Sequence, residues 1–247
     1  MSIVKYIPNT ITSMNLLCGV LGVISTFNGR MDLAFCLMLG AAVCDFFDGF
    51  SARMLKAYSD IGKELDSLSD MVSFGVLPAV MMFCLMKGQG GSCTSESCPA
   101  CWLCYIPLII AVFSALRLAK FNVDERQTES FIGLATPSCA MLCGSLAYYV
   151  TKCPESTLAA WAATKWSIPV LSVILSALLV CEIPMFSMKF KKGADGKVKI
   201  GTERLVFAAC ALVEIIMTVI LKQNWSFAII LIFLTYIIMN LFGVLKK

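Results

Sequence analysis

The sequence predicts an all-α, polytopic integral membrane protein, a bundle of about eight transmembrane helices with both termini in the cytoplasm. Hydrophobic residues make up 59% of its 247 residues and charged residues only 15%, more apolar surface than a soluble domain of this length can bury. The apolar stretches are continuous rather than alternating, which disfavours strands. The net charge of +4 is modest, and we expect no nucleic-acid partner.

Apolar stretches of helical length recur along the whole chain. A membrane-spanning helix needs about 20 apolar residues, with about 17 as a lower limit. Eight stretches approach or meet this length, at residues 10–27, 33–50, 67–86, 102–118, 134–150, 168–188, 205–221 and 227–244. The second and third run into polar ends, so hydropathy alone would score them poorly. Glu182 and Glu214 fall inside the later stretches, where a carboxylate is costly, and we expect interhelical pairing or a lipid headgroup contact.

The distribution of Lys and Arg predicts the orientation. With the N-terminus inside and eight spans, 15 of the 20 basic residues lie on the cytoplasmic side and five lie outside, as the positive-inside rule requires. The same topology places a cysteine cluster on the outer face, where an oxidising compartment favours structural disulfides and a metal site is the alternative. The cluster comprises Cys93, Cys98, Cys101 and Cys104, with Cys153 nearby.

Four aspartates mark the candidate site. Asp45 and Asp48 are three residues apart, and Asp66 and Asp70 are four apart, so each pair shares one helix face. The second stretch runs inward and the third outward, which brings all four carboxylates to the inner leaflet. Bare carboxylates would repel one another there, and acidic residues in a membrane mark function by default. The pattern therefore predicts bound cations.

The residue types around the aspartates narrow the chemistry. The chain has no histidine, which excludes His-based triads and His-ligated zinc. All-oxygen ligation selects hard ions such as Mg²⁺ or Mn²⁺, and four carboxylates suit a two-metal centre on a phosphate substrate. Gly49 and Gly62 would let phosphates approach the backbone, Ala52 keeps the helix face shallow, and Arg53 offers a cation for phosphate oxygens. Solvated helix caps are the alternative reading of such acidic residues.

The aspartates and their neighbours form a recognisable motif. Residues 45–70 fit the pattern D-x2-D-G-x2-A-R-x8-G-x3-D-x3-D at all eight fixed positions, and the chain thereby resembles the CDP-alcohol phosphatidyltransferase family. The resemblance implies one membrane-embedded domain over 1–247, with a catalytic core at about 1–190 and peripheral helices at 205–244. It implies two divalent cations, Mg²⁺ or Mn²⁺, and a homodimer. The implied metal ligands are Asp45, Asp48, Asp66 and Asp70, with Asp70 also the general base, and the implied nucleotide contacts are Gly49, Ala52, Arg53 and Gly62.

Three further stretches resemble the phosphatidylserine synthase branch of that family. They are residues 7–19, 69–79, and 117–122 together with 131–137. This resemblance implies transfer of the phosphatidyl group from CDP-diacylglycerol to L-serine, at the cytoplasmic face of a bacterial inner membrane. Lys120 stands where the branch usually has Arg, and Ala135 where it often has Pro. Glycerol 3-phosphate or inositol as acceptor remains an alternative, and a cation transporter is a further one.

The acceptor and nucleotide pockets have additional candidate residues. Serine is a zwitterion, so its carboxylate needs a cation, and Arg117 and Lys120 lie at a cytoplasmic helix end; positive-inside anchoring explains them equally well. Hydrogen bonds from Asn122 and Thr136 would complete the acceptor site. Thr12 and Asn15 share a face of the first helix and are candidates for nucleotide contact, with ordinary interhelical hydrogen bonding as the alternative.

Overall fold

The computed structural model describes residues 6–57, 59–88, 101–123, 131–185, 191–192, 198–199 and 202–245. These residues are almost entirely helical, which confirms the predicted fold class. The helical elements in chain order are α1 (Tyr6–Phe27), α2 (Met31–Met54), α3 (Asp60–Asp70), the π-helical turn η2 (Met71–Val76), α4 (Leu77–Gly88), the 3₁₀ stretch η3 (Cys101–Leu108), α5 (Ile109–Val123), α6 (Thr136–Lys152), α7 (Thr157–Ala162), α8 (Ser167–Val180), α9 (Thr202–Ile220) and α10 (Trp225–Leu245).

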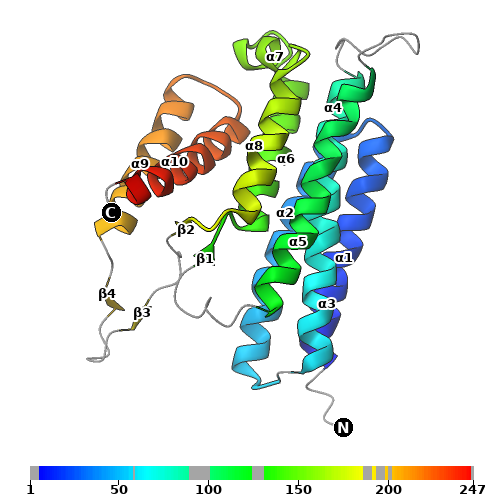
Figure 1. The fold of residues 1–247 in the computed structure, drawn as a ribbon, viewed down its shortest axis with the longest axis vertical. Helices are drawn as coiled ribbons and strands as arrows, with labels where there is room; N and C mark the ends of the chain where they lie inside the picture. Colours follow the sequence, from blue (N-terminus) through cyan, green and yellow to red (C-terminus); the bar gives the residue numbers. More distant parts are fainter. Residues whose placement is uncertain are drawn as a thin grey trace.

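Helices α1 to α6 and α8 run up and down along the longest axis of the molecule, whereas α10 lies obliquely beside them (Figure 1). α1 packs along α2 and against α3, and the continuous α3–η2–α4 rod contacts α5 and α6. α9 and α10 form a hairpin that joins the bundle mainly through the contact of α10 with α6. Four short strands occur: β1 (Phe131–Ile132) pairs antiparallel with β2 (Pro184–Met185), and β3 (Lys191–Lys192) with β4 (Val198–Lys199).

Each of the eight predicted apolar stretches corresponds to a helix or a continuous helical rod. Four helical segments of the described chain are long and apolar enough to cross a membrane: 6–27, 31–54, 60–88 and 102–123. The remaining helices are shorter or less apolar by that measure, so the total of eight spans stays a prediction. Many apolar side chains remain exposed, for example Leu212, Val219 and Ile220 on α9, as expected for surfaces that face lipid.

One boundary prediction was wrong. The stretch at 168–188 was expected to be a single span enclosing Glu182, but α8 ends at Val180 and Glu182 lies in the following segment with a 72% exposed side chain. Pro184 explains the early end, because proline disfavours the helical conformation of the residue before it and lacks the N–H that a helix needs. Glu182 therefore avoids the cost of burial that its predicted position implied.

Close helix contacts organise the core around small residues. A Cβ on Gly144 of α6 would lie 1.9 Å from Met38 Cε and 3.0 Å from Phe35 Cδ2, both on α2. The ring of Phe35 also stacks against Trp225 of α10, with centroids 5.6 Å apart. The glycine thus lets α2 and α6 approach closely, as small residues do in membrane helix packing.

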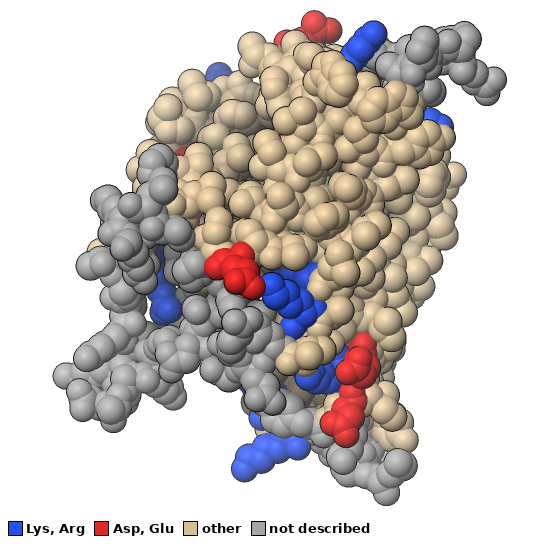
Figure 2. All heavy atoms as spheres, in the orientation of Figure 1, with Lys and Arg blue, Asp and Glu red and all other residues tan. Residues whose placement is uncertain are grey.

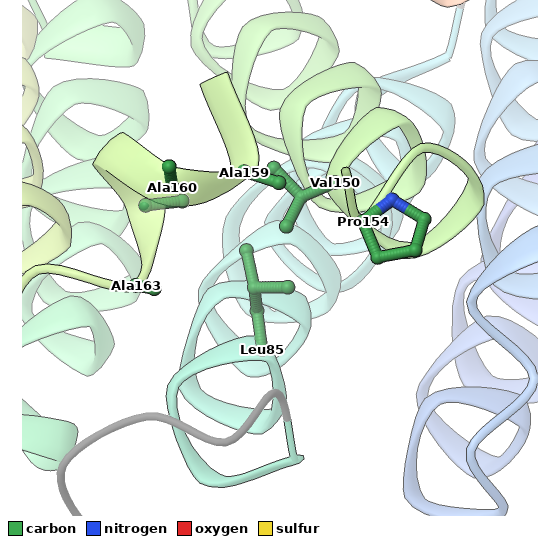
Figure 3. Close-up of a pocket in the computed structure, with 7 residues that line it drawn as sticks. Leu85, Val150, Pro154, Ala159, Ala160 and Ala163 are labelled. Carbon is green, nitrogen blue, oxygen red and sulfur yellow. The ribbon is translucent and has the colours of Figure 1, made fainter. Parts of the chain in front are cut away.

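An apolar cavity lies at the α7 end of the molecule. It has a volume of about 210 Å³ and is lined by Leu85 of α4, Val150 of α6, Pro154 just after α6, and alanines in and beside α7 (Figure 3). α7 and the end of α4 occupy the top of Figure 1, whereas the C-terminal end of α2 and the start of α3 lie at the bottom. The cavity is therefore remote from the aspartates, and its lining offers no side chain for catalysis.

Candidate active site

The acidic cluster forms where the last turns of α2 face α3. Carboxylate oxygens of Asp45, Asp48 and Asp66 all lie within 4.8 Å of one another. Asp48 is buried, and the other two are half-buried. Helical spacing places Asp45 and Asp48 on one face of α2, and the reversal of the chain between α2 and α3 brings Asp66 opposite them. Three of the four predicted carboxylates thus converge as expected.

The chemistry of this cluster fits divalent cations. Asp48 Oδ2 and Asp66 Oδ1 are buried without a hydrogen-bond partner among the described residues, and leaving such oxygens unpaired is costly. Three close carboxylates also repel one another. A hard cation would satisfy the unpaired oxygens and remove the repulsion at once, and carboxylate oxygens are the ligands that Mg²⁺ and Mn²⁺ prefer. Asp45, Asp48 and Asp66 are therefore fitted to hold metal.

Asp70 lies one turn beyond Asp66, within electrostatic reach of the cluster. Asn15 Nδ2 donates a hydrogen bond of 3.2 Å to Asp70 Oδ1, which fixes one oxygen of the carboxylate. The chain then continues into the π-helical turn η2, a feature often found at functional sites.

Two serines clamp α1 against the α3–η2 rod on either side of Asp70. Ser69 Oγ donates to Thr12 O over 3.2 Å, and Ser73 Oγ donates to Asn15 O over 3.0 Å. Thr12 is itself buried and lies beside the carboxylate of Asp48. Thr12 and Asn15 were predicted as nucleotide contacts, and the structure places both against aspartates of the cluster. These hydrogen bonds tie α1 to the segment that carries the acidic residues, and contact of Thr12 or Asn15 with the nucleotide stays a prediction.

The four motif residues predicted to contact the nucleotide, Gly49, Ala52, Arg53 and Gly62, lie in two different environments. On α2, a Cβ on Gly49 would meet only Arg53 Nη2, at 3.8 Å, and Ala52 and the exposed Arg53 follow on the same helix. Arg53 Nε donates to Gly49 O over 2.8 Å. This part of α2 leaves the backbone accessible next to a cation.

Gly62 has a structural reason to be glycine. A Cβ there would lie 2.9 Å from both Asn9 Oδ1 and Ser59 Oγ. Ser59 is the N-cap of α3, and its hydroxyl accepts a hydrogen bond of 3.0 Å from Gly62 N, as N-cap serines commonly do. The missing side chain therefore lets the N-terminus of α3 close against α1. A nucleotide contact by Gly62 remains a prediction beside this packing role.

Arg117 and Thr136, two of the predicted acceptor residues, lie together. Arg117 of α5 is only 8% exposed, and its Nη1 donates to Thr136 Oγ1 over 3.2 Å. The guanidinium also lies within electrostatic reach of Asp70. The bend before α6 makes this contact possible, because Gly133 has φ of +76° and a Cβ there would be 2.7 Å from Leu179 O. Only glycine tolerates that position easily.

The other two acceptor candidates are engaged elsewhere in the same region. Asn122 Nδ2 donates to Ser67 Oγ over 2.9 Å, which links the end of α5 to α3 beside Asp66. Lys120 Nζ lies 3.3 Å from Glu182 Oε1. Both contacts tie α5 to neighbouring segments, and neither residue reaches the acidic cluster through them.

Sequence reasoning assigned no site residue to the two C-terminal helices, yet α10 approaches Arg117. Tyr236 is 4% exposed and lies within electrostatic reach of the Arg117 guanidinium. Its ring packs against Phe207 of α9 with centroids 5.9 Å apart. The available signal was a tyrosine inside an otherwise apolar stretch, since a buried tyrosine hydroxyl usually needs a polar partner.

Several predicted features lie away from this site. Glu214 of α9 accepts a hydrogen bond from Thr235 of α10, in agreement with the expected interhelical pairing. Cys93, Cys98 and the side chain of Cys101 lie outside the described residues, so the predicted disulfides stay a prediction. Of the two other cysteines in that group, Cys104 is buried and Cys153 is a free thiol.

Comparison with known proteins agrees with this geometry. The chain is 34% identical over 137 residues to CDP-diacylglycerol–serine O-phosphatidyltransferase of Bacillus subtilis, covering 56% of this chain and 72% of that protein. It is 31% identical over 192 residues to the protein of the same name from Mycobacterium leprae, covering 74% of this chain and 59% of the relative. A namesake from Methanocaldococcus jannaschii is 31% identical over 136 residues, or 57% of its length. The family model for CDP-alcohol phosphatidyltransferases matches residues 5–190, which include all four aspartates, and the chain therefore belongs to the CDP-alcohol phosphatidyltransferase family.

Proposed function

We propose that this chain transfers the phosphatidyl group of CDP-diacylglycerol to the hydroxyl of L-serine and releases CMP. The observation that carries the proposal is the acidic cluster, with two buried unpaired oxygens, next to an Asp70 held by Asn15. The names of the relatives in three genera add support for serine as the acceptor. Arg117 supplies the buried cation that an amino-acid carboxylate requires.

The proposed roles follow from position and chemistry. Asp45, Asp48, Asp66 and Asp70 would hold two divalent cations, Mg²⁺ or Mn²⁺, which offset the charge of the diphosphate and of the departing CMP. Gly49, Ala52 and Arg53 would contact the nucleotide, with Gly62 and Thr12 close by.

Asp70 would act as the general base, accepting the proton of the serine hydroxyl as that oxygen forms its bond to the phosphorus that carries diacylglycerol. The bond from that phosphorus to the CMP oxygen then breaks. Asn15 donates to one Asp70 oxygen, and because a carboxylate has about four acceptor positions on its two oxygens, positions are left for both a metal ion and the proton. General-base catalysis of this kind contributes about 10²–10⁴-fold to a rate.

On the acceptor side, Arg117 would bind the serine carboxylate. One of its N–H groups is taken by Thr136, but a guanidinium has five donors, so the remaining fork can pair with a carboxylate. Thr136 fixes the orientation of the guanidinium, and Tyr236 closes it from the α10 side.

The location and assembly follow the same proposal. The exposed basic residues Arg53, Lys56 and Lys63 lie at the end of the molecule that carries the acidic cluster, as the positive-inside rule expects for a cytoplasmic face. In Figure 2 a broad uncharged area of the visible surface lies between charged side chains at the top edge and those in the lower part. We place the active site at the cytoplasmic face of a bacterial inner membrane, in a homodimer whose subunits are single domains with a core at about 1–190.

The acceptor is tested with purified protein in detergent, CDP-diacylglycerol and Mg²⁺ or Mn²⁺. L-Serine, glycerol 3-phosphate and inositol are supplied separately, and CMP release is measured. The proposal predicts release with serine at a rate well above that with the other two. Release with another acceptor would keep the family and overturn the serine assignment.

A further inference from the structure

A second charged contact borders the Arg117–Thr136 pair. One turn beyond Arg117 on α5, Lys120 Nζ lies 3.3 Å from Glu182 Oε1. Glu182 is two residues before β2, and β2 pairs with β1, which leads directly into the segment that ends at Thr136. The ion pair and the Arg117–Thr136 hydrogen bond therefore join the same two parts of the fold, α5 and the paired β1–β2 segments. Lys120 and Glu182 are exposed, whereas Arg117, one turn earlier on α5, is buried.

The ion pair contributes two opposite charges one turn from Arg117. The side chains of Lys120 and Glu182 are 36% and 72% exposed, so both face solvent, and their opposite charges offset each other. Arg117 has no carboxylate within 4 Å among the described residues. The Lys120–Glu182 pair thus adds no net charge, and Arg117, which Asp70 reaches only electrostatically, keeps N–H donors for an anionic group. One cation matches the single carboxylate of an amino acid, whereas a phosphate monoester brings about two negative charges.

Glu182 also acts differently on the two ends of a zwitterion. Its carboxylate repels a phosphate that approaches the Arg117 site, and it attracts the ammonium group of an amino acid whose carboxylate pairs with Arg117. Attraction of the wanted group and repulsion of the unwanted one together discriminate better than either alone.

We propose that Glu182, held in place by Lys120, is a specificity-determining residue that favours a zwitterionic amino alcohol over phosphorylated acceptors. This inference rests on the proposed transfer to serine. It assigns Lys120 a different task from the carboxylate binding predicted from the sequence: Lys120 positions Glu182 and limits its charge, while Arg117 alone binds the acceptor carboxylate.

The test uses two variants of this pair, the edge variants, that change its net charge in opposite directions. Glu182→Gln removes the negative charge and frees Lys120, and Lys120→Gln leaves Glu182 unopposed. For each variant, two constants are measured: the KM for L-serine, and the inhibition constant of glycerol 3-phosphate against serine-dependent CMP release. The selectivity ratio is this inhibition constant divided by the KM for serine, so a high ratio means preference for serine. Opposite charges at the edge of a site act through water over a few ångströms, so we expect the selectivity ratio to change about tenfold. Glu182→Gln should lower it and Lys120→Gln should raise it.

The chain provides a matched control. Asp32 and Lys152 form another exposed ion pair, with a distance of 3.5 Å and side chains 48% and 43% exposed, at the opposite end of the bundle. Asp32→Asn should leave the ratio unchanged. Exposed pairs contribute little to stability, so all three variants should fold. In 1 M salt the screening length falls from about 8 Å to about 3 Å, and the difference between the two edge variants should shrink.

The outcomes separate the inference from the proposed function. If the wild-type protein uses glycerol 3-phosphate in preference to serine, both are wrong. If it uses serine and the two edge variants leave the ratio unchanged, or shift it in the same direction, the proposed function stands and the role of Glu182 is refuted. A shift in the same direction would indicate that the ion pair serves only to hold the segments together.

Discussion

Replacing Gly19 of α1 by alanine would place a Cβ 2.4 Å from Ser73 Oγ and 2.9 Å from Ser73 Cα. The second contact is with backbone, so a side-chain rotation cannot relieve it, and α1 must move away from η2. Overpacking of this kind costs about 1–3 kcal/mol. Because Ser73 Oγ donates to Asn15 O and Asn15 holds Asp70, the displacement also reaches the proposed base.

Gly40 of α2 provides the matched control, because a Cβ there would meet only Cys18 Sγ, at 3.9 Å. Both substitutions gain about 1 kcal/mol of helix propensity, so the difference between Gly19→Ala and Gly40→Ala isolates the clash. A difference of 1–3 kcal/mol corresponds to about 2–4 °C in Tm for each kcal/mol in a chain of this size.

The assay is thermal unfolding of the two detergent-solubilised variants, followed by serine-dependent CMP release at a temperature where both are folded. We expect Gly19→Ala to have the lower Tm and reduced activity, and Gly40→Ala to match or exceed the wild-type Tm with full activity. Equal Tm values for the two variants would refute the packing argument. If Gly19→Ala is destabilised but fully active, the inference that a displacement at Ser73 reaches Asp70 through Asn15 is refuted.

Three further changes probe the site. Asn15→Ala removes the donor to Asp70, and because Asp70 is then misplaced we expect kcat to fall at least about tenfold with the KM for serine little changed; a change confined to KM would contradict this role. Tyr236→Phe should raise the KM for serine several-fold by loosening Arg117, while Tyr148→Phe, whose ring packs against Phe35 and Trp225, should leave it unchanged. Chelation of divalent cations should abolish CMP release, and Mg²⁺ or Mn²⁺ should restore it, whereas activity that persists in the chelator would exclude the metal-binding role of the cluster.

The helices were predictable from the sequence because lipid requires long, continuous apolar segments. The acidic cluster was predictable as well, since helical spacing places Asp45 with Asp48 and Asp66 with Asp70 whatever the details of packing. The boundary after α8 was missed although Pro184 signalled it, because hydropathy continued past the proline and outweighed the local backbone rule.

Contacts between segments that are distant in the chain could not be predicted from the sequence. The pairing of Lys120 with Glu182 depends on how β1 and β2 dock beside α5, and no local pattern encodes that docking. The approach of Tyr236 to Arg117 depends on the placement of the α9–α10 hairpin. Gly62 illustrates a different problem: the motif assigns it to the ligand, which stays a prediction, whereas the packing requirement that the structure shows at the N-cap of α3 has no signal in the sequence.

The central claim is that the four aspartates form a metal-dependent centre for transfer of the phosphatidyl group to serine. Its most direct test is serine-dependent CMP release by wild-type protein, Asp70→Asn and Asp60→Asn under identical conditions. Asp60 is an exposed residue in the first turn of α3, so its variant controls for loss of one negative charge nearby. The account predicts release by the wild type and Asp60→Asn and a loss of at least about 10²-fold in Asp70→Asn. Comparable release by all three proteins would contradict it.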